Sequence, residues 1–143
     1  MLYKLVKDFK RKYPGTVCWR IRQHCKIVDR QLASDEKILY AFAAQKNPNV
    51  FDIVSTCVVA ITNKRIVIGQ KRLLFGYFFT SITPDLFNDI KAHMGLTWGK
   101  IIIDTVKEVV ILSNISKKAL IEIEKEISEH MIREKKKFLQ KNR

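Results

Sequence analysis

Residues 52–70, DIVSTCVVAITNKRIVIGQ, contain two runs of β-branched residues on either side of a short polar centre, Thr62-Asn63-Lys64-Arg65. β-Branched side chains favour strands, and asparagine accepts the left-handed backbone that a tight turn needs. We expect Thr62 and Arg65 to close such a turn with hydrogen bonds. The stretch therefore predicts a β-hairpin whose turn is the polar centre.

Further strands are predicted on both sides of this hairpin. One covers residues 38–44 and is followed by a turn-rich segment over 45–50. Downstream, strands are predicted over 73–82, over 86–94 after the turn at 83–85, over 98–105 and over 106–112. The chain thus holds about seven short strands in succession.

The pattern changes to a helical period at Ser116, a residue type that caps helix N-termini. Leu120, Ile123, Ile127 and Met131 then recur on one face, which predicts a helix over residues 116–138. At about 1.5 Å per residue this helix would be about 34 Å long. Its basic end is expected to extend beyond a small barrel.

Residues 1–33 are predicted to form a basic helical extension to a domain that covers residues 34–143. The first helix carries a stripe of Leu2, Leu5, Val6 and Phe9 and ends at Pro14-Gly15. A second helix, over about 16–31, carries Cys18, Ile21, Cys25 and Val28. We expect both stripes to dock on the following domain. The alternative is that the first helix contacts a membrane or a partner, with Leu5 and Phe9 inserted.

Three motifs resemble those of the bacterial pleckstrin homology (PH) domains, and the short YokE-like group in particular. They are ITNKRI at 61–66, the segment from Ser81-Ile82 to Asp89-Ile90, and GLTWGKIII at 95–103. The resemblance covers residues 34–132. It implies an α+β, mainly β, PH-like fold: a bent barrel of about seven antiparallel strands capped by a long C-terminal helix, here with an N-terminal helical extension. Lipid-binding members of the superfamily use basic residues after the first strand, where this chain has only Lys46, so specific inositide recognition is not expected.

Charge favours anionic partners. The chain has 27 Lys and Arg against 14 Asp and Glu, a formal net charge of +13 that is concentrated at its two ends. The candidate contacts to an anionic surface are Lys4, Lys7, Lys10, Arg11, Lys12, Lys135, Lys136 and Lys137. The candidate loop and turn contacts are Lys46, Lys64, Arg65, Lys71 and Arg72.

Catalytic and cofactor chemistry is not indicated. His24, His93 and His130 are scattered over three predicted elements without a neighbouring nucleophile motif, and no Gly-rich phosphate loop occurs. The three cysteines form no metal-site spacing and predict reduced thiols. We expect no enzyme, no metal and no cofactor. With no apolar run near 20 residues and no signal-peptide pattern, the expected location is cytoplasmic, peripheral to a membrane at most.

The leading hypothesis is a non-enzymatic binding module that acts as a protein-interaction adaptor and contacts anionic membrane through its basic ends. A first alternative is nucleic-acid binding through the basic second helix, where Trp19 beside Arg20 offers a stacking group. A second alternative is a self-associating structural protein, that is, a homo-oligomer.

Overall fold

The structure is a computed structural model that describes residues 1–47, 49 and 51–141. Pro48 and Val50, which belong to the turn segment predicted over 45–50, lie outside the described residues. The helices are α1 (Leu2–Lys12), α2 (Ile21–Gln31) and α3 (Leu120–Lys141), with short 3₁₀ turns η1 (Ile53–Ser55) and η2 (Lys117–Ala119). The strands are β1 (Ile38–Gln45), β2 (Thr56–Thr62), β3 (Ile66–Lys71), β4 (Tyr77–Ile82), β5 (Phe87–Met94), β6 (Gly99–Thr105) and β7 (Val109–Ile115).

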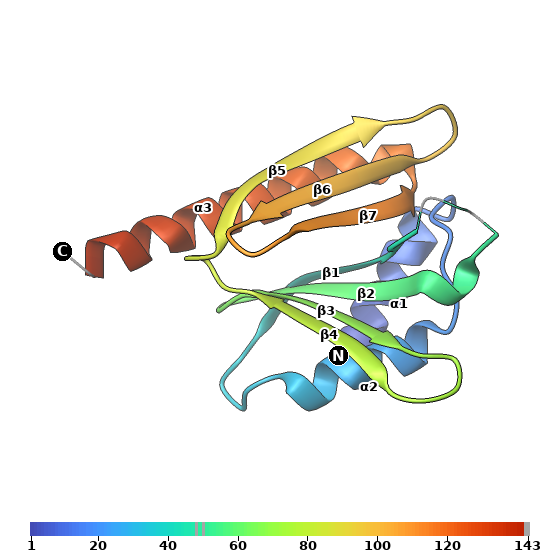
Figure 1. Ribbon diagram of the computed structural model, residues 1–143, viewed down its shortest axis with the longest axis horizontal. Coiled ribbons are helices and arrows are strands. Elements are labelled where there is room, and N and C mark those ends of the chain that lie inside the picture. Colours follow the sequence, from blue (N-terminus) through green and yellow to red (C-terminus); the bar gives the residue numbers. More distant parts are fainter. Residues whose placement is uncertain (48, 50, 142–143) are drawn as a thin grey trace.

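The seven strands form one antiparallel sheet in the order β4-β3-β2-β1-β7-β6-β5. β1 and β7 pair only at Gln45 and Ser113, so the two strands diverge from that point and the sheet bends into two layers (Figure 1). α3 lies along the β5–β7 layer, while α1 and α2 cover the outer face of the other layer. The predicted order of seven strands and a closing helix is confirmed.

The hairpin predicted over 52–70 is formed by β2 and β3, and every residue of β2 is buried. Cys57, Val59 and Ile61 belong to the main core between the two layers. Val58 and Ala60 belong to a second core beneath the N-terminal helices. Because both faces of β2 are covered, the strand is continuously apolar instead of alternating with polar residues.

The apolar stripe of α1 packs against the domain, as one of the two expectations had it. Leu2 and Val6 are fully buried in the second core. Phe9 reaches the main core, where its ring centroid lies 5.9 Å from that of Phe42. The alternative prediction, that Leu5 and Phe9 insert into a bilayer, is therefore wrong for this fold, because Phe9 is buried and Leu5 packs against the second core.

The second helix begins at Ile21, five residues later than predicted. The Val17 amide donates to the Asn114 carbonyl at 3.0 Å, and the Trp19 amide donates to the Thr56 hydroxyl at 3.0 Å. Arg20 then adopts a left-handed conformation, with φ 56°. Residues 17–19 thus bond to other segments before the helix starts, and Cys18 is not part of the helical stripe.

The strand predicted over 73–82 is wrong in its first half, because β4 starts only at Tyr77. The Arg72 amide donates to the Gly76 carbonyl at 3.1 Å, and Gly76 has φ +76°, which closes a tight loop. Leu73, Leu74 and Phe75 form the tip of this loop. The apolar run that resembled a core strand is a solvent-exposed hairpin loop.

The last strand also differs from its prediction, since β7 covers Val109–Ile115 and not 106–112. The Thr105 amide donates to the Glu108 carbonyl at 3.0 Å, so residues 105–108 form the turn between β6 and β7. The predicted C-terminal helix is present as η2 followed by the 22 residues of α3. Its second half extends beyond the sheet, as predicted (Figure 1).

Candidate functional site

Apolar side chains are exposed on two neighbouring loops at one end of the domain. The β1–β2 loop exposes Phe51, Ile53 and Val54, and the β3–β4 loop exposes Leu73, Leu74 and Phe75. Trp19, Tyr77 and Phe78 add partly exposed aromatic rings beside them. We call these nine residues the loop-end patch.

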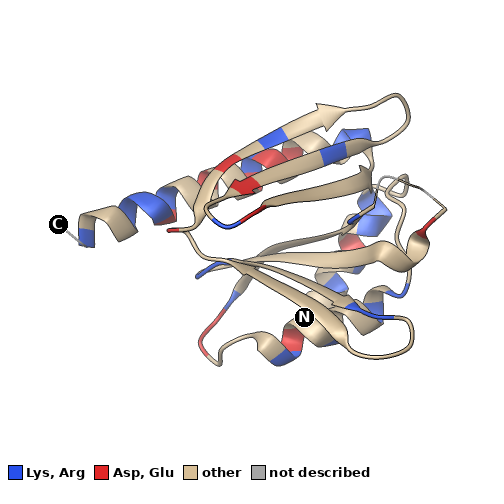
Figure 2. Cartoon of the chain, viewed as in Figure 1, with Lys and Arg blue, Asp and Glu red and all other residues tan. Residues whose placement is uncertain are grey.

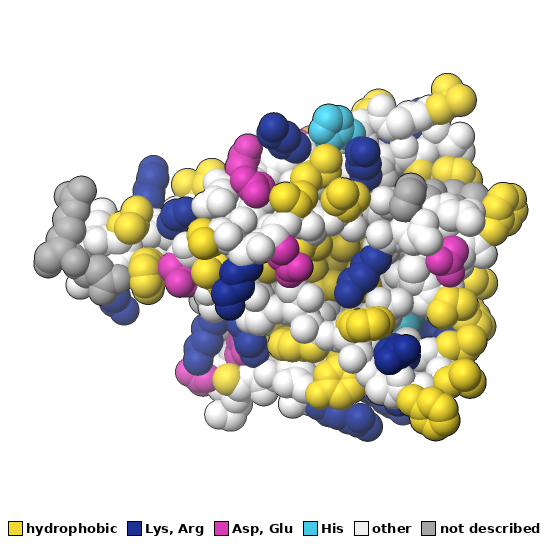
Figure 3. Space-filling view, in the orientation of Figure 1, with side chains coloured by type: hydrophobic (Ala, Val, Ile, Leu, Met, Phe, Trp, Pro, Cys, Tyr) yellow, Lys and Arg dark blue, Asp and Glu magenta, His cyan; other side chains and the backbone are white. Residues whose placement is uncertain are grey.

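The tips of the loop-end patch are among the most exposed large side chains of the described chain. Phe51 is 90% exposed, Leu74 79% and Phe75 81%. Figure 3 shows hydrophobic side chains gathered at the right-hand end, where Figure 1 has the β1–β2 and β3–β4 loops. A cluster of exposed rings and leucines is costly in water, which makes this surface a candidate for contact with another molecule.

Four basic residues adjoin the loop-end patch. The Lys46 ammonium lies 5.0 Å from the centroid of the Phe78 ring, and the Arg72 guanidinium carbon lies 5.4 Å from the same centroid. Arg20 lies 5.6 Å from the Trp19 ring, and Lys71 immediately precedes Arg72. These cation–π distances place positive charge beside the partly exposed aromatic rings of the loop-end patch. We call Arg20, Lys46, Lys71 and Arg72 the basic collar.

Buried polar contacts hold the two loops and the start of α2 together. The Gln70 side-chain amide donates to the Val54 carbonyl at 2.9 Å, which joins β3 to the β1–β2 loop. The Lys71 amide donates to Nδ1 of His24 at 2.8 Å. Because Nδ1 accepts, the ring proton is on Nε2, which donates to the Trp19 carbonyl at 3.0 Å. One imidazole thus positions backbone on both sides of the loop-end patch.

The environment of His24 keeps this imidazole neutral. The pKa of His24 is lowered to about 4, chiefly by burial; the hydrogen bond to the Trp19 carbonyl opposes this decrease, and the nearby Arg20 charge adds a smaller one in the same direction as burial. The neutral form is the one that accepts the Lys71 amide. His24 is therefore a structural support of the site, fixed in one tautomer at neutral pH.

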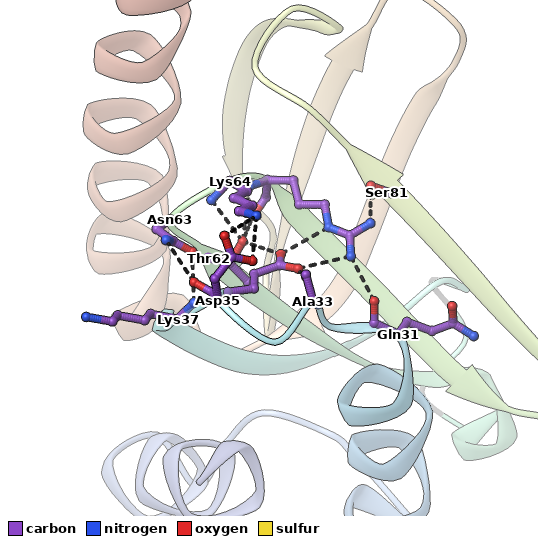
Figure 4. A network of polar contacts seen from close by, with 10 residues as sticks. Gln31, Ala33, Asp35, Lys37, Thr62, Asn63, Lys64 and Ser81 are labelled. Carbon is purple, nitrogen blue, oxygen red and sulfur yellow. Dashed lines mark hydrogen bonds and ion pairs between the residues drawn. The ribbon is translucent and has the colours of Figure 1, made fainter.

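Lys64 and Arg65 lie at the opposite end of the β2–β3 hairpin from the loop-end patch. The six residues of β3 separate them from Lys71 and Arg72 by about 20 Å. Both side chains are engaged in the polar network of Figure 4. The Lys64 ammonium contacts the Asp35 carboxylate at 2.7 and 2.8 Å.

The Arg65 guanidinium joins three segments of the chain. Its Nε donates to Glu36 at 3.0 Å, one Nη donates to the Ser81 hydroxyl at 3.1 Å, and the other donates to the Gln31 carbonyl at 2.9 Å (Figure 4). Thr62 also contributes, since its hydroxyl donates to Glu36 at 2.6 Å and accepts the Arg65 amide at 3.1 Å. Thr62 and Arg65 close the turn as predicted, and Arg65 in addition ties the end of α2 to the sheet.

Glu36 is the acceptor at the centre of this network, and its carboxylate is almost completely buried. Burial alone would raise its pKa, but hydrogen bonds from Arg65, Thr62 and the Ala33 amide outweigh burial and hold the pKa of Glu36 at about 2. The carboxylate is ionised at any physiological pH. Arg65 is thereby committed to a structural ion pair.

The basic residues of the two chain ends lie on α1 and on the second half of α3 (Figure 2). Hydrogen bonds or ion pairs within the chain engage five of the eight candidates: Lys10 with the Pro14 and Thr16 carbonyls, Arg11 with Asp8, Lys12 with Glu122, Lys135 with the Phe87 carbonyl, and Lys137 with Glu134. The Lys7 ammonium lies 5.2 Å from the centroid of the Tyr3 ring. Lys4, Lys7 and Lys136 are exposed to solvent. Lys135, Lys136 and Lys137 do not share a surface with the basic collar, because α3 ends at the opposite end of the molecule from the β1–β2 and β3–β4 loops (Figure 1).

Of the thirteen basic candidates, the structure brings together Lys46, Lys71 and Arg72. Sequence reasoning missed their apolar neighbours, chiefly Phe51, Leu74 and Phe75. A signal was available: Gly76 interrupts the apolar run directly after Lys71-Arg72, and a glycine at that place is typical of a hairpin loop.

Other site chemistry is sparse in the part of the chain that the structure describes. Over residues 1–47, 49 and 51–141, His, Cys, Asp and Glu side chains form no group of three or more that could hold a metal ion. The three cysteines are free thiols. Among the described helices none is long and apolar enough to cross a membrane.

Comparisons with known proteins agree with this architecture. A family model described as "Bacterial PH domain" matches residues 32–129. The fold is similar to the pleckstrin homology domain from Shewanella amazonensis SB2B, with a TM-score of 0.54, 12% sequence identity, and coverage of 78% of this chain and 96% of that domain. The hSac2 domain from human phosphoinositide phosphatase Sac2 is more distant, with a TM-score of 0.41, 9% identity, and coverage of 64% and 63%. No curated protein matches the chain.

The bent seven-stranded sheet with its closing helix has the pleckstrin homology-like fold. The chain belongs to the bacterial PH domain family, whose model matches about two thirds of its length.

Proposed function

We propose that this protein is a non-enzymatic binding module that docks on anionic membrane surfaces through the loop-end patch. The observation that carries the proposal is the combination of exposed rings and leucines on two adjacent loops with a basic collar beside them. Apolar tips favour the acyl region of a bilayer, and the collar would lie at the level of the headgroups. Binding to a protein partner would not require apolar groups at the tips with basic groups beside them.

The magnitudes are sufficient for reversible binding. A Lys or Arg near an anionic surface contributes about 1 kcal/mol, and full burial of a leucine or phenylalanine contributes about 1.5–3 kcal/mol. Three or four partly inserted side chains with the collar would exceed the cost of immobilising the protein. We therefore propose the loops as the membrane contact, whereas the sequence pattern suggested the basic ends.

The direct test is co-sedimentation with vesicles of phosphatidylcholine, with and without phosphatidylserine. The wild-type chain is expected to sediment with the anionic vesicles and to lose binding as salt is added. Replacing both Leu74 and Phe75 by serine should lower the partition coefficient at least about tenfold, because two inserted apolar groups are removed. The matched control is Val106→Ser, which removes an exposed apolar residue from the distant β6–β7 turn.

Charge variants distinguish the loop end from the chain ends. Lys71→Ala with Arg72→Ala should weaken binding to anionic vesicles and reduce its salt dependence. Lys4→Ala with Lys7→Ala removes the same charge from α1 and should change binding by less than about twofold. If both double variants lose vesicle binding equally, the basic chain ends take part in the membrane contact and the loop end is not its specific site. If the wild-type chain binds neutral and anionic vesicles equally, the electrostatic part of the proposal is refuted.

Three narrower assignments accompany this proposal. The motifs at 61–66, 81–90 and 95–103 support membership of the YokE-like group. A cytoplasmic location with peripheral membrane attachment follows from the proposed contact. A protein partner, as expected of an adaptor, would bind while the loop end is occupied by lipid.

The nucleic-acid alternative stays a prediction, with Arg22, Lys26 and Arg30 on the exposed side of α2 as its candidate phosphate contacts. A gel-shift titration with single- and double-stranded oligonucleotides at several salt concentrations tests it. Binding that survives Leu74→Ser with Phe75→Ser but is lost on neutralising these three residues would favour nucleic acid over membrane.

A further inference from the structure

Helix α3 carries a second exposed apolar surface, separate from the loop-end patch. Its buried face, formed by residues such as Ile123, Ile127 and Met131, packs on the core. On another face Ile121 is 75% exposed, Ile132 46% and Leu139 55%. Within the part of the chain that the structure describes, a large share of the surface of these side chains, the stripe on α3, is left exposed to solvent.

The stripe has the spacing of a helix–helix interface. Ile121, Ser128, Ile132 and Leu139 follow one another at intervals of seven, four and seven residues, which keeps them on one side of the helix. The series of intervals is the same whether it is counted from the N-terminal or from the C-terminal end of the helix. An antiparallel copy of the helix therefore sets Ile132 against Ser128 of the other chain, and Ile121 against Leu139.

The charge of α3 changes sign between its two halves, from mainly acidic to mainly basic. The first half holds Glu122, Glu124, Glu126 and Glu129 with Lys125, and the second half holds Arg133, Lys135, Lys136, Lys137 and Lys141 with Glu134 (Figure 2). An antiparallel pair brings the acidic half of each helix beside the basic half of the other, whereas a parallel pair would bring like charges together. The helix dipoles also oppose each other favourably in the antiparallel arrangement.

We propose that α3 is a self-association surface through which two copies of this chain form an antiparallel, two-fold symmetric dimer. The same patch of each copy forms both sides, as closed two-fold symmetry requires. A single helix pair is small for a stable interface. We therefore expect a monomer–dimer equilibrium with a dissociation constant on the order of 10 µM.

Sedimentation equilibrium or light scattering over a concentration series tests the dimer. The mass should rise from that of one 16.7 kDa chain toward twice that value as concentration increases. Ile132→Glu, at the centre of the stripe, should raise the dissociation constant at least tenfold. The matched control Val106→Glu adds the same charge at an exposed apolar position outside α3 and should leave self-association unchanged. Circular dichroism melts of both variants verify that they are folded.

Cysteine cross-linking tests the orientation. In the antiparallel pair Ile121 of one copy lies beside Leu139 of the other, while the two Ile121 positions are about 27 Å apart. The double variant Ile121→Cys, Leu139→Cys should form a reducible covalent dimer under mild oxidation. Each single variant, and the wild type with its native cysteines, should not.

Three results overturn the proposal. The first is a monomer at every concentration up to several hundred micromolar, and the second is cross-linking of the single variants as strong as that of the double variant. If Ile132→Glu leaves the mass unchanged but weakens vesicle binding, the stripe is a lipid contact and the dimer is refuted. Because Leu74→Ser with Phe75→Ser should not alter self-association, failure of the dimer and failure of the membrane proposal are distinguishable.

Discussion

The Nε atom of Arg65 lies 3.0 Å from Oε2 of Glu36, and this ion pair is the point where the end of α2, the segment before β1 and the β2–β3 turn meet. Glu36 is almost fully buried, so removal of either partner leaves a buried group without its counterion. The pair therefore has a structural role, although the sequence offers Arg65 as a basic residue at the tip of a hairpin.

Arg65→Ala should destabilise the protein by about 3 kcal/mol, because Glu36 would remain buried and ionised without its main hydrogen-bond donor. Lys64→Ala is the matched control. Lys64 pairs with the largely exposed Asp35, and such a pair contributes less than about 1 kcal/mol. Urea unfolding followed by tryptophan fluorescence measures both changes. Equal effects of the two variants would contradict the structural role of Arg65.

The same pair predicts an acid-dependent loss of stability. Since folding lowers the pKa of Glu36 from 4.5 to about 2, the ionised carboxylate stabilises the fold above pH 4.5, and this contribution is lost as the pH falls toward 2. Glu36→Gln should abolish that part of the pH dependence. The measurement is the free energy of unfolding of wild type and variant between pH 5 and pH 2; parallel curves would refute the assignment.

The buried His24 predicts a separate loss of stability at a less acidic pH. Its pKa is lowered from 6.5 to about 4 in the folded protein, so the unfolded chain binds the proton more readily between these values. Stability should be complete above pH 6.5 and decrease as the pH falls toward 4. His24→Gln should flatten the curve in this window. The matched control is His93→Gln, which removes an imidazole from an exposed position on β5.

Gly69 fixes how closely α2 approaches β3. A Cβ atom at this position would lie 2.5 Å from Cγ2 of Val28, so Gly69→Ala forces the helix away from the sheet and should cost about 1–3 kcal/mol. Gly15→Ala is the control, because its Cβ would meet Ser116 at an ordinary 3.6 Å. In a Val28→Ala background the cost of Gly69→Ala should largely disappear. Thermal melts of the four variants measure this coupling.

Phe9 predicts that the N-terminal extension and the sheet unfold together. Phe9→Ala removes a buried ring from the main core and should cost about 3–5 kcal/mol, whereas Lys7→Ala, on the exposed side of α1, should change stability by less than about 0.5 kcal/mol. Both variants should unfold in one transition. A separate early transition for the helices in Phe9→Ala would show instead that the extension is an independent unit.

The elements with a long, regular pattern were predictable from sequence. The β2–β3 hairpin has β-branched runs on both sides of an asparagine turn, and α3 has an uninterrupted 3.6-residue period, so local preference and burial agree in both. The start of α2 was missed because residues 17–19 bond to β2 and to the end of β7, which are far away in the sequence. No local pattern reveals such partners.

The site was only partly predictable. Lys46, Lys71 and Arg72 were identified by their charge, but Leu74 and Phe75 have the composition of a core strand and lie at the tip of a loop. Hydrophobicity in a sequence normally reports burial against the rest of the chain. At a surface that contacts another phase or molecule the same composition has the opposite meaning, and only the structure distinguishes the two cases.

The contacts of the first sixteen residues also bear on how the chain folds during synthesis. The Ser116 amide donates to the Thr16 hydroxyl at 3.0 Å across 100 residues of sequence, and the Trp98 indole donates to the Gly15 carbonyl at 2.7 Å across 83 residues. Gly15 and Thr16 are synthesised long before these two partners, so their contacts form only after Trp98 and Ser116 have been made. The apolar side of α1 can pack earlier, because Leu2 and Val6 lie in the second core with residues of β1, β2 and β3. Completion of the main core, which includes residues of β6, β7 and α3, is the late, long-range step in folding.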